Sequence, residues 1–161
     1  MRGSVGSTAE RRLRMLLVER LSELDLLVDP KLTPDQVLDA HALPRNFLLK
    51  SDVAMRFGSD PDVSFSRKDQ LIAVLEIKGG IDPAGALERY GAAKKTFEHA
   101  LEIAPRCETF FLTAVETKEV ARRLEADRLV RHVFNIIKLA DDPKYRETFF
   151  DELFNHALRL R

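Results

Sequence analysis

The sequence contains one cysteine, Cys107, and only seven glycines and seven prolines in 161 residues. A single cysteine has no intramolecular partner, which excludes a disulfide framework and a cysteine-rich zinc module and fits a reducing cytoplasm. No apolar run approaches the roughly 18 residues that a membrane helix needs, and the N-terminus lacks the apolar core of a signal peptide. We therefore expect a soluble, cytoplasmic protein with no membrane partner.

An excess of charge of one sign is also missing, because 26 basic residues balance 26 acidic ones. The overall charge therefore predicts no polyanionic partner, and nucleic-acid binding has to be argued from local charge. The four histidines are dispersed without metal-ligand spacing, which argues against a zinc site. Hydrophobic residues make up 45% of the chain, which at this length is enough for one core and one domain.

The N-terminal part predicts one long helix and one loop. The first seven residues resemble an expression leader, so we predict that residues 8–161 form the single domain. Between Thr8 and Val28, leucines recur every three or four residues and predict an amphipathic helix, with Thr8 as its N-cap. Segment 29–44 carries three prolines and predicts a loop around one brief helix at 35–41.

Three segments in the middle of the chain predict strands. Residues 47–57 and 62–65 hold short apolar runs, and residues 58–61 between them have turn composition. Residues 71–78 are apolar on both faces until their end, which is typical of a strand in the centre of a sheet.

The second half predicts alternating helices and strands. Gly79-Gly80 ends the central strand, and Asp82-Pro83 predicts an N-cap and the first helical position of a helix that runs to about Ala104. The remaining segments are a strand at 109–115, a charged helix at 118–129, a fifth strand or a competing helix at 133–139, and a final helix at 145–160. This order predicts an α/β fold with a central mixed sheet of four to five strands, flanked by helices.

Charged residues stand where the apolar central strand ends. Glu76 and Lys78 project from the same face, because side chains alternate along a strand. Asp62 opens the preceding strand, and a short turn between antiparallel neighbours would bring it across from Glu76. Asp52 and Asp60 are rivals for this role, but the Pro-Asp pairing and the position at the start of a strand favour Asp62.

This set of residues suits phosphodiester hydrolysis. Hard divalent cations take oxygen ligands, so the carboxylates of Asp62 and Glu76 and the backbone carbonyl of Ile77 would hold Mg²⁺, with Mn²⁺ as a substitute. The metal would polarise the phosphoryl oxygen and activate a bound water. Lys78 would orient that water and offset charge in the transition state.

The same residues resemble a known motif. Pro61-Asp62 followed by Glu76-Ile77-Lys78 on a strand resembles the PD-(D/E)xK motif of restriction-endonuclease-like nucleases, and the order of elements resembles their common core. Within that superfamily, the stretch 74–90 is most similar to XcyI-type type II restriction endonucleases. The resemblance implies a DNA-cutting enzyme of a restriction system that acts on GC-rich palindromes. It also implies that Asp62 and Glu76 are metal ligands and that Lys78 orients the water. A two-fold protein matches a palindrome best, so we predict a homodimer.

Further site residues are open at this point. Some members of the superfamily place a glutamate of the first helix near the metals, and Glu19 and Glu23 are the candidates here. The helix after the motif carries Arg89, Lys94 and Lys95, which would contact DNA phosphates as that helix passes the cleft. Ordinary packing of long basic side chains along a helix is the competing interpretation for these three residues.

Two alternative functions compete with a restriction enzyme. A resolvase-like or repair nuclease on the same core would prefer branched or single-stranded DNA. A non-catalytic DNA-binding module would keep the fold without the chemistry, and an isolated Glu-x-Lys on a strand is often just a solvated ion pair. The presence of Asp62, Glu76 and Lys78 together argues against the module, because a protein without chemistry needs none of them.

Overall fold

Helices and strands alternate along the chain in the computed structural model, which describes residues 2–160 and, from Thr8 onward, their side chains. The strands are β1 (Leu27–Asp29), β2 (Asn46–Leu49), β3 (Val53–Phe57), β4 (Val63–Arg67), β5 (Gln70–Lys78), β6 (Glu108–Thr113) and β7 (His132–Asn135). The α-helices are α1 (Arg2–Glu23), α2 (Pro34–Asp39), α3 (Ala86–Ile103), α4 (Lys118–Ala126), α5 (Ile136–Asp141) and α6 (Pro143–Phe150). Two 3₁₀ turns, η1 (Lys50–Asp52) and η2 (Pro83–Gly85), and a π-helical segment, η3 (Asp151–Ala157), complete the elements.

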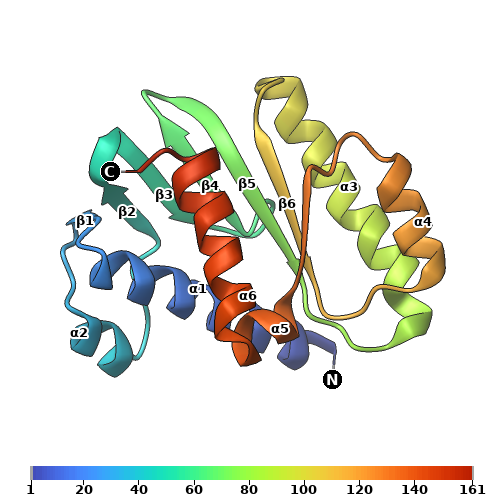
Figure 1. Ribbon diagram of the computed structural model, residues 1–161, viewed down its shortest axis with the longest axis horizontal. Coiled ribbons are helices and arrows are strands. Elements are labelled where there is room, and N and C mark those ends of the chain that lie inside the picture. The colour runs from blue at the N-terminus through green and yellow to red at the C-terminus, as the bar shows by residue number, and fades with distance from the viewer. Residues whose placement is uncertain (1, 161) are drawn as a thin grey trace.

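The strands form one mixed sheet in chain order, from β1 at one edge to β7 at the other. Strands β1 to β5 pair antiparallel with their neighbours, whereas β6 and β7 run parallel to β5. Parallel neighbours need a crossover connection, and α3 and α4 provide the two crossovers. The carboxyl ends of β5, β6 and β7 therefore meet at one end of the sheet (Figure 1).

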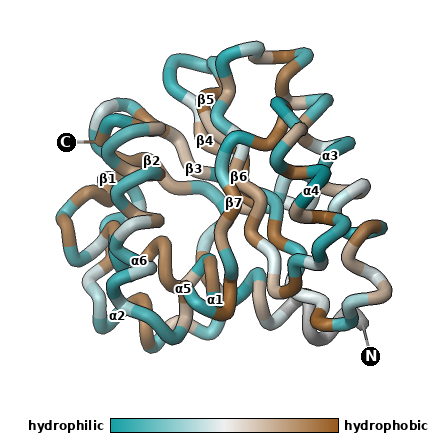
Figure 2. The backbone as a smooth tube through the Cα atoms, turned by 45° about the vertical axis from the view of Figure 1, so that its right-hand side comes forward, coloured by the Kyte–Doolittle hydropathy of each residue, from teal (hydrophilic) through white to brown (hydrophobic). Residues whose placement is uncertain are grey.

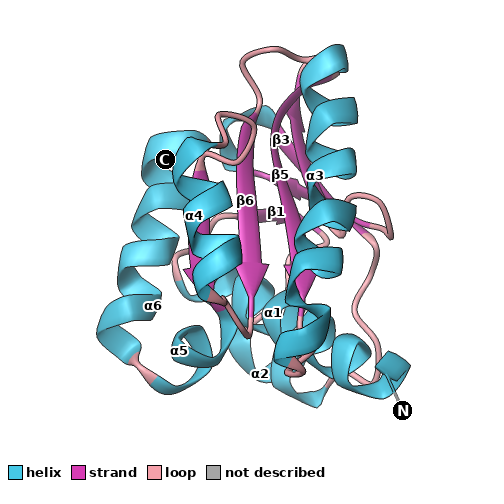
Figure 3. Cartoon of the chain, turned by 90° about the vertical axis from the view of Figure 1, so that its right-hand side faces the viewer, coloured by secondary structure: helices cyan, strands magenta, loops and turns pink. Residues whose placement is uncertain are grey.

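Helices cover the two faces of the sheet unequally. Leu13, Leu17 and Leu21 of α1 share the larger core with residues of α6, and this core covers one face of β2 to β6. A smaller core holds α3 and α4 against the other face, where it includes Val74 of β5 and Phe111 of β6. Figure 3 shows α6 and α3 on opposite sides of β6. In Figure 2 apolar residues follow β6 and β7 through the middle of the molecule.

The structure corrects the expected start of the first helix. α1 begins at Arg2, so Thr8 lies inside the helix and is not its N-cap. That residues 1–7 are a leader stays a prediction. The helix ends at Glu23 and is followed by the edge strand β1. The sequence did not predict this strand, because the leucine spacing continues to Val28 and favoured helix throughout. The brief helix expected at 35–41 is confirmed as α2, and Thr33 caps it.

The segment 47–57, which we expected to be one strand, is a hairpin. β2 and β3 are joined by η1, where Ser51 and Asp52 have positive φ angles of 66° and 57°. Side chains of both strands alternate toward the same core, so the apolar pattern continues across the turn without a break. This hairpin and β1 account for a sheet of seven strands, where the sequence predicted four to five.

The second half follows the predicted order, with two changes of detail. The Asp82 carboxylate accepts a hydrogen bond from the Ala84 N–H (3.0 Å), which confirms the cap, but the turn that it caps is η2, which leads into α3. The segment 133–139 contains both of the competing elements, because β7 ends at Asn135 and that residue caps α5. A mixed sheet flanked by helices is therefore the architecture of this chain.

Candidate active site

Two carboxylates lie opposite each other where β4 begins and β5 nears its end. Val63 and Leu75 are the last paired residues there, and Asp62 and Glu76 are the next residues outward. The Asp62 N–H donates to Glu76 Oε1 (3.0 Å), and the Ile77 N–H donates to Asp62 Oδ2 (2.7 Å). The two side chains thus bond the backbone of the opposite strand and extend the ladder beyond its regular end.

Lys78 completes this group. Its Nζ atom lies 3.5 Å from Glu76 Oε2, and its side chain is 26% exposed, whereas that of Glu76 is 1% exposed. The ammonium group therefore stands at the solvent side of a buried carboxylate. Glu76 Oε2 itself is buried and accepts no hydrogen bond from the residues that the structure describes. An unsatisfied buried carboxylate oxygen is costly, and it is available to a cation.

Burial disfavours the charged form of both carboxylates. It raises the pKa of Asp62 to about 7, although the hydrogen bond from the Ile77 N–H acts in the opposite direction. It raises the pKa of Glu76 to about 8, and the neighbouring charge of Asp62 raises that pKa further, while Lys78 lowers it. Near neutral pH the pair therefore retains protons, which a divalent cation would displace.

Helix α1 also reaches this end of the sheet. Arg14 Nη2 donates to the Gly58 carbonyl (2.9 Å), and its guanidinium lies over the Phe57 ring, 5.3 Å from the centroid. Arg14 therefore ties α1 to the turn that precedes Asp62. One helical turn earlier, the half-buried Glu10 lies near enough that its charge raises the pKa of Asp62.

The acid of α1 whose charge acts on Asp62 is Glu10, and neither of the sequence candidates does so. Glu23 lies more than three turns further along α1, where its carboxylate is 3.4 Å from Arg20 Nη1, and Glu19 lies one turn before it. The leucine spacing shows which face of α1 is buried. It does not show which end of α1 lies beside the ends of the strands, because that depends on tertiary packing.

The rival carboxylates do not join the pair. Asp52 lies in η1, at the end of β3 opposite to the turn that leads to Asp62. Asp60 lies in that turn and is exposed, and its charge raises the pKa of Glu76 without a hydrogen bond to it. The structure therefore places Asp62, the residue that the sequence favoured, across from Glu76.

Two of the three basic residues predicted to contact DNA are engaged within the protein. Arg89 Nη2 donates to the Asp82 carbonyl (2.6 Å), and its guanidinium fills the space beside Gly85, where an added Cβ would lie 2.5 Å from Nη1. Lys94 Nζ lies 3.9 Å from Asp127 Oδ2, the atom that accepts the Tyr90 hydroxyl.

Lys95 differs from these two residues. It is exposed and lines a hollow of about 690 Å³ between α3 and the turn that contains Asp60. Among the described residues it has neither an ion pair nor a side-chain hydrogen bond. Of the three predicted contacts, Lys95 is the one whose charge has no partner among the described residues, and the carboxylates that line the same hollow are those of Asp60 and Glu88.

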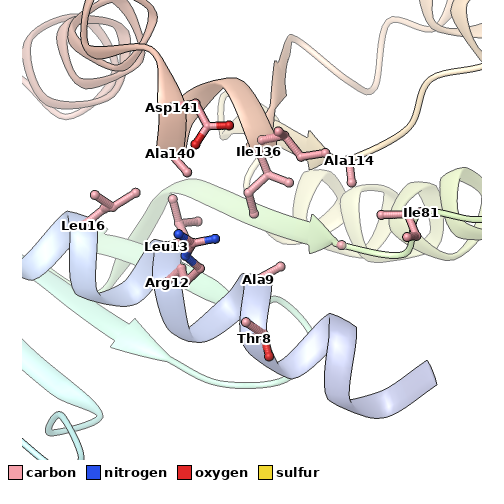
Figure 4. Close-up of a pocket in the computed structure, with 12 residues that line it drawn as sticks. Thr8, Ala9, Arg12, Leu13, Leu16, Ile81, Ala114, Ile136, Ala140 and Asp141 are labelled. Atoms are coloured by element: carbon pink, nitrogen blue, oxygen red, sulfur yellow. The ribbon is translucent and has the colours of Figure 1, made fainter. Parts of the chain in front are cut away.

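A second cavity, of about 370 Å³, lies between α1 and α5 near the same end of the sheet (Figure 4). Leu13, Ile81 and Ile136 from three different segments line it, as Figure 4 shows. Neither of the paired carboxylates nor Lys78 lines this cavity, and its walls are mostly apolar. It is therefore separate from the candidate site.

The paired carboxylates fit a hard cation even though their number is small. No group of three or more His, Cys, Asp or Glu residues within the described part of the chain is arranged to hold a metal. A strand residue directs its N–H and C=O toward the same neighbour, so the Ile77 carbonyl faces the same side as its N–H, which bonds Asp62. Two carboxylates, this carbonyl and water make an oxygen ligand set of the kind that Mg²⁺ takes.

Comparison with known protein families matches the chain to the XcyI restriction endonuclease family over residues 28–153. That is well over half of the chain. The chain belongs to the XcyI restriction endonuclease family. The matched region contains Asp62, Glu76 and Lys78, whereas Glu10 lies before it. A search of curated proteins found no match.

Membership of the XcyI family makes the protein a nuclease, a hydrolase that acts on DNA. Restriction endonucleases are typically dependent on divalent metals. The described residues contain no helix that is long and apolar enough to cross a membrane.

Proposed function

We propose that this XcyI-family protein is a magnesium-dependent endonuclease of a type II restriction system that hydrolyses phosphodiester bonds in DNA. The observation that supports this most is the buried pair of Asp62 and Glu76 with Lys78 Nζ 3.5 Å from Glu76 Oε2. If the same motif were only a solvated ion pair without a catalytic role, Glu76 would be exposed, whereas its side chain is 1% exposed. Burial of two like charges is costly unless a cation joins them.

In this proposal Asp62, Glu76 and the Ile77 carbonyl hold the cation, and Mn²⁺ is able to replace Mg²⁺. When bound, the cation polarises the scissile phosphate and lowers the pKa of a water molecule. Asp62 and Glu76 would lose their protons on holding a cation, because burial raises their pKa values to about 7 and about 8 without one.

Lys78 contributes in a different way. Its ammonium group is on the same strand face as Glu76 and partly exposed, so it can contact both an attacking water and the phosphate. It orients the water for in-line attack on phosphorus and offsets the negative charge that develops as the bond to the leaving oxygen breaks. Its positive charge is needed in the transition state more than in metal binding.

The assembly and the exact substrate belong to the same proposal. We expect a homodimer, because two copies related by a two-fold axis match a palindromic site and make one cut in each strand. A resolvase-like or repair nuclease would use the same three residues on branched or single-stranded DNA. The match to a restriction endonuclease family favours the first option.

The test is incubation of the full chain with varied plasmid DNA in Mg²⁺, in Mn²⁺ and in EDTA, with sequencing of the ends. We expect defined double-strand cuts with either metal and none in EDTA. Glu76→Ala should abolish cleavage while leaving the fold intact, and Glu98→Ala, an exposed position on α3, serves as the matched control. Binding without any cut would support a non-catalytic module, and cleavage by Glu76→Ala at wild-type rate would refute the site.

A further inference from the structure

Within the part of the chain that the structure describes, neither core places a helix over the antiparallel half of the sheet face that carries the catalytic residues. Val74 packs under α3, and Glu76 and Lys78, two and four residues later, lie on that same face of β5. The register pairs Ser64 with Val74, so Ser64 also lies on this face, and so does Arg56, which pairs with Ser64. The catalytic face thus continues from β5 across β4 and β3.

Side chains on this continuation are exposed or half-buried, unlike those on the opposite face. We call this surface the open face, and its residues are Asn46, Leu48, Ala54, Arg56, Ser64 and Ser66. Asn46, Ala54 and Arg56 are exposed, whereas Met55 and Phe65, which point the other way, are 1% and 0% exposed. The open face is an accessible part of the sheet that leads directly to the carboxylates.

The chemistry of the open face is polar and short-chained. Asn46, Arg56 and Ser64 form one row across three strands, two residues along the strands from the level of Asp62 and Glu76. Arg56 has neither an ion pair nor a side-chain hydrogen bond within the described part of the chain. Leu48, which is 42% exposed, is the one large apolar residue of the open face, too little for a hydrophobic protein interface.

The hollow beside α3 borders the same region. Lys95 and His99 lie on one wall, Asp60 and Glu88 also line the hollow, and an added Cβ on Gly91 would meet nothing within 4 Å. Lys95 therefore shares this hollow with Asp60, which lies in the turn that leads to Asp62, while Arg56 lies two strands away from β5 on the sheet. Strands are spaced by about 4.8 Å, so the backbone of Arg56 lies roughly 10 Å across the sheet from that of β5.

We propose that the open face and the hollow together bind one sugar-phosphate strand of the DNA, with Arg56 and Lys95 contacting phosphates on either side of the scissile one. This inference rests on the proposed nuclease function. Three observations carry it: the continuity of the open face with Asp62 and Glu76, its donors Ser64 and Asn46, and the two cations without protein partners. Asp60 and Glu88 repel phosphate, so the strand follows Arg56 and Lys95 and stays clear of those two carboxylates.

The test compares Arg56→Gln, Lys95→Gln and the control Arg106→Gln by fluorescence anisotropy with a labelled duplex in EDTA, across a range of KCl. Arg106 is exposed and lies two residues before β6, so it lies at the end of the sheet opposite Lys78. We expect each of the first two variants to reduce the salt slope by about 1 and to weaken binding roughly tenfold at 0.1 M salt. The control should match the wild type, and all three should keep the wild-type affinity for Mn²⁺.

A second measurement does not depend on affinity. Ala54→Cys places a thiol on the open face. The control, Leu38→Cys, places one on α2, which packs on α1 at the opposite face. The natural Cys107 is fully buried and should not react with an alkylating reagent. Duplex DNA should slow alkylation of Ala54→Cys at least tenfold and leave Leu38→Cys unchanged.

Failure of the inference differs from failure of the proposed function. If the wild type cuts DNA while Arg56→Gln and Lys95→Gln keep its salt slope and Ala54→Cys labels freely in DNA, the strand lies elsewhere and the nuclease stands. If alkylation of Ala54→Cys without DNA becomes slower as the protein concentration rises, the open face is an interface between copies and the inference is overturned. A wild type that neither binds nor cuts DNA overturns both.

Discussion

Glu76→Gln in the metal-free protein should make stability depend less on pH, and the sign follows from the buried carboxyl. Burial and the charge of Asp62 raise the pKa of Glu76 from its ordinary 4.5 to about 8. Between these values the folded protein retains a proton that the unfolded chain has lost. The free energy of unfolding of the wild type must therefore fall as the pH rises from about 4.5 to 8.

The size of this effect can be worked from the same shift. A change of pKa from 4.5 to about 8 corresponds to roughly 5 kcal/mol at most, and relaxation of the site around the ionised pair reduces it to roughly 2 to 5 kcal/mol. Glutamine keeps the shape and the oxygen that accepts the Asp62 N–H, but it never ionises. The variant should equal the wild type near pH 4.5 and exceed it by that amount above pH 8.

Urea unfolding in EDTA at several pH values measures the difference, with Glu98→Gln on the exposed side of α3 as the control. Addition of Mg²⁺ at pH 8 should then stabilise the wild type, by about 2.7 kcal/mol at a hundred times the dissociation constant, and leave Glu76→Gln unchanged. A stability difference that is the same at every pH, or a variant less stable than the wild type at pH 9, would refute the account of a buried carboxylate pair.

Three further outcomes test other parts of the structure. Lys78→Met should lower the single-turnover cleavage rate on the order of a hundredfold at saturating Mg²⁺ while metal affinity is retained, and cutting at wild-type speed would end its catalytic role. Asp82→Ala should cost ~1 kcal/mol of stability in thermal unfolding, because the Ala84 N–H loses its cap acceptor; no loss would mean that the cap is unimportant. Phe97→Ala should cost about 3 to 5 kcal/mol in urea unfolding, because that ring projects from α3 and is fully buried in the core between α3 and the sheet. A loss below about 1 kcal/mol would contradict the packing.

The local part of this site follows from the residue pattern alone. Alternation along a strand places Glu76 and Lys78 on one face whatever the rest of the fold does, and the apolar run before them requires a central strand. The Pro-Asp at the start of the preceding strand was enough to choose Asp62, because a short turn between antiparallel strands leaves few registers.

Features that depend on distant segments became visible only in the packed fold. The apolar alternation of 47–57 did not reveal the turn at η1, because both strands of that hairpin face one core. Which end of α1 lies at the site is set by the packing of the whole helix on the sheet, and this brings Glu10 near Asp62 and leaves Glu23 away.

The engagement of charges was equally a tertiary matter. The sequence offered Arg89 and Lys94 as possible DNA contacts, but Arg89 bonds the loop after β5 and Lys94 pairs with Asp127. Lys95, the next residue, has no such partner among the described residues. Local spacing determines which face of an element a side chain occupies. Only the packing of elements against one another determines what that side chain meets, because those partners lie tens of residues away in the chain.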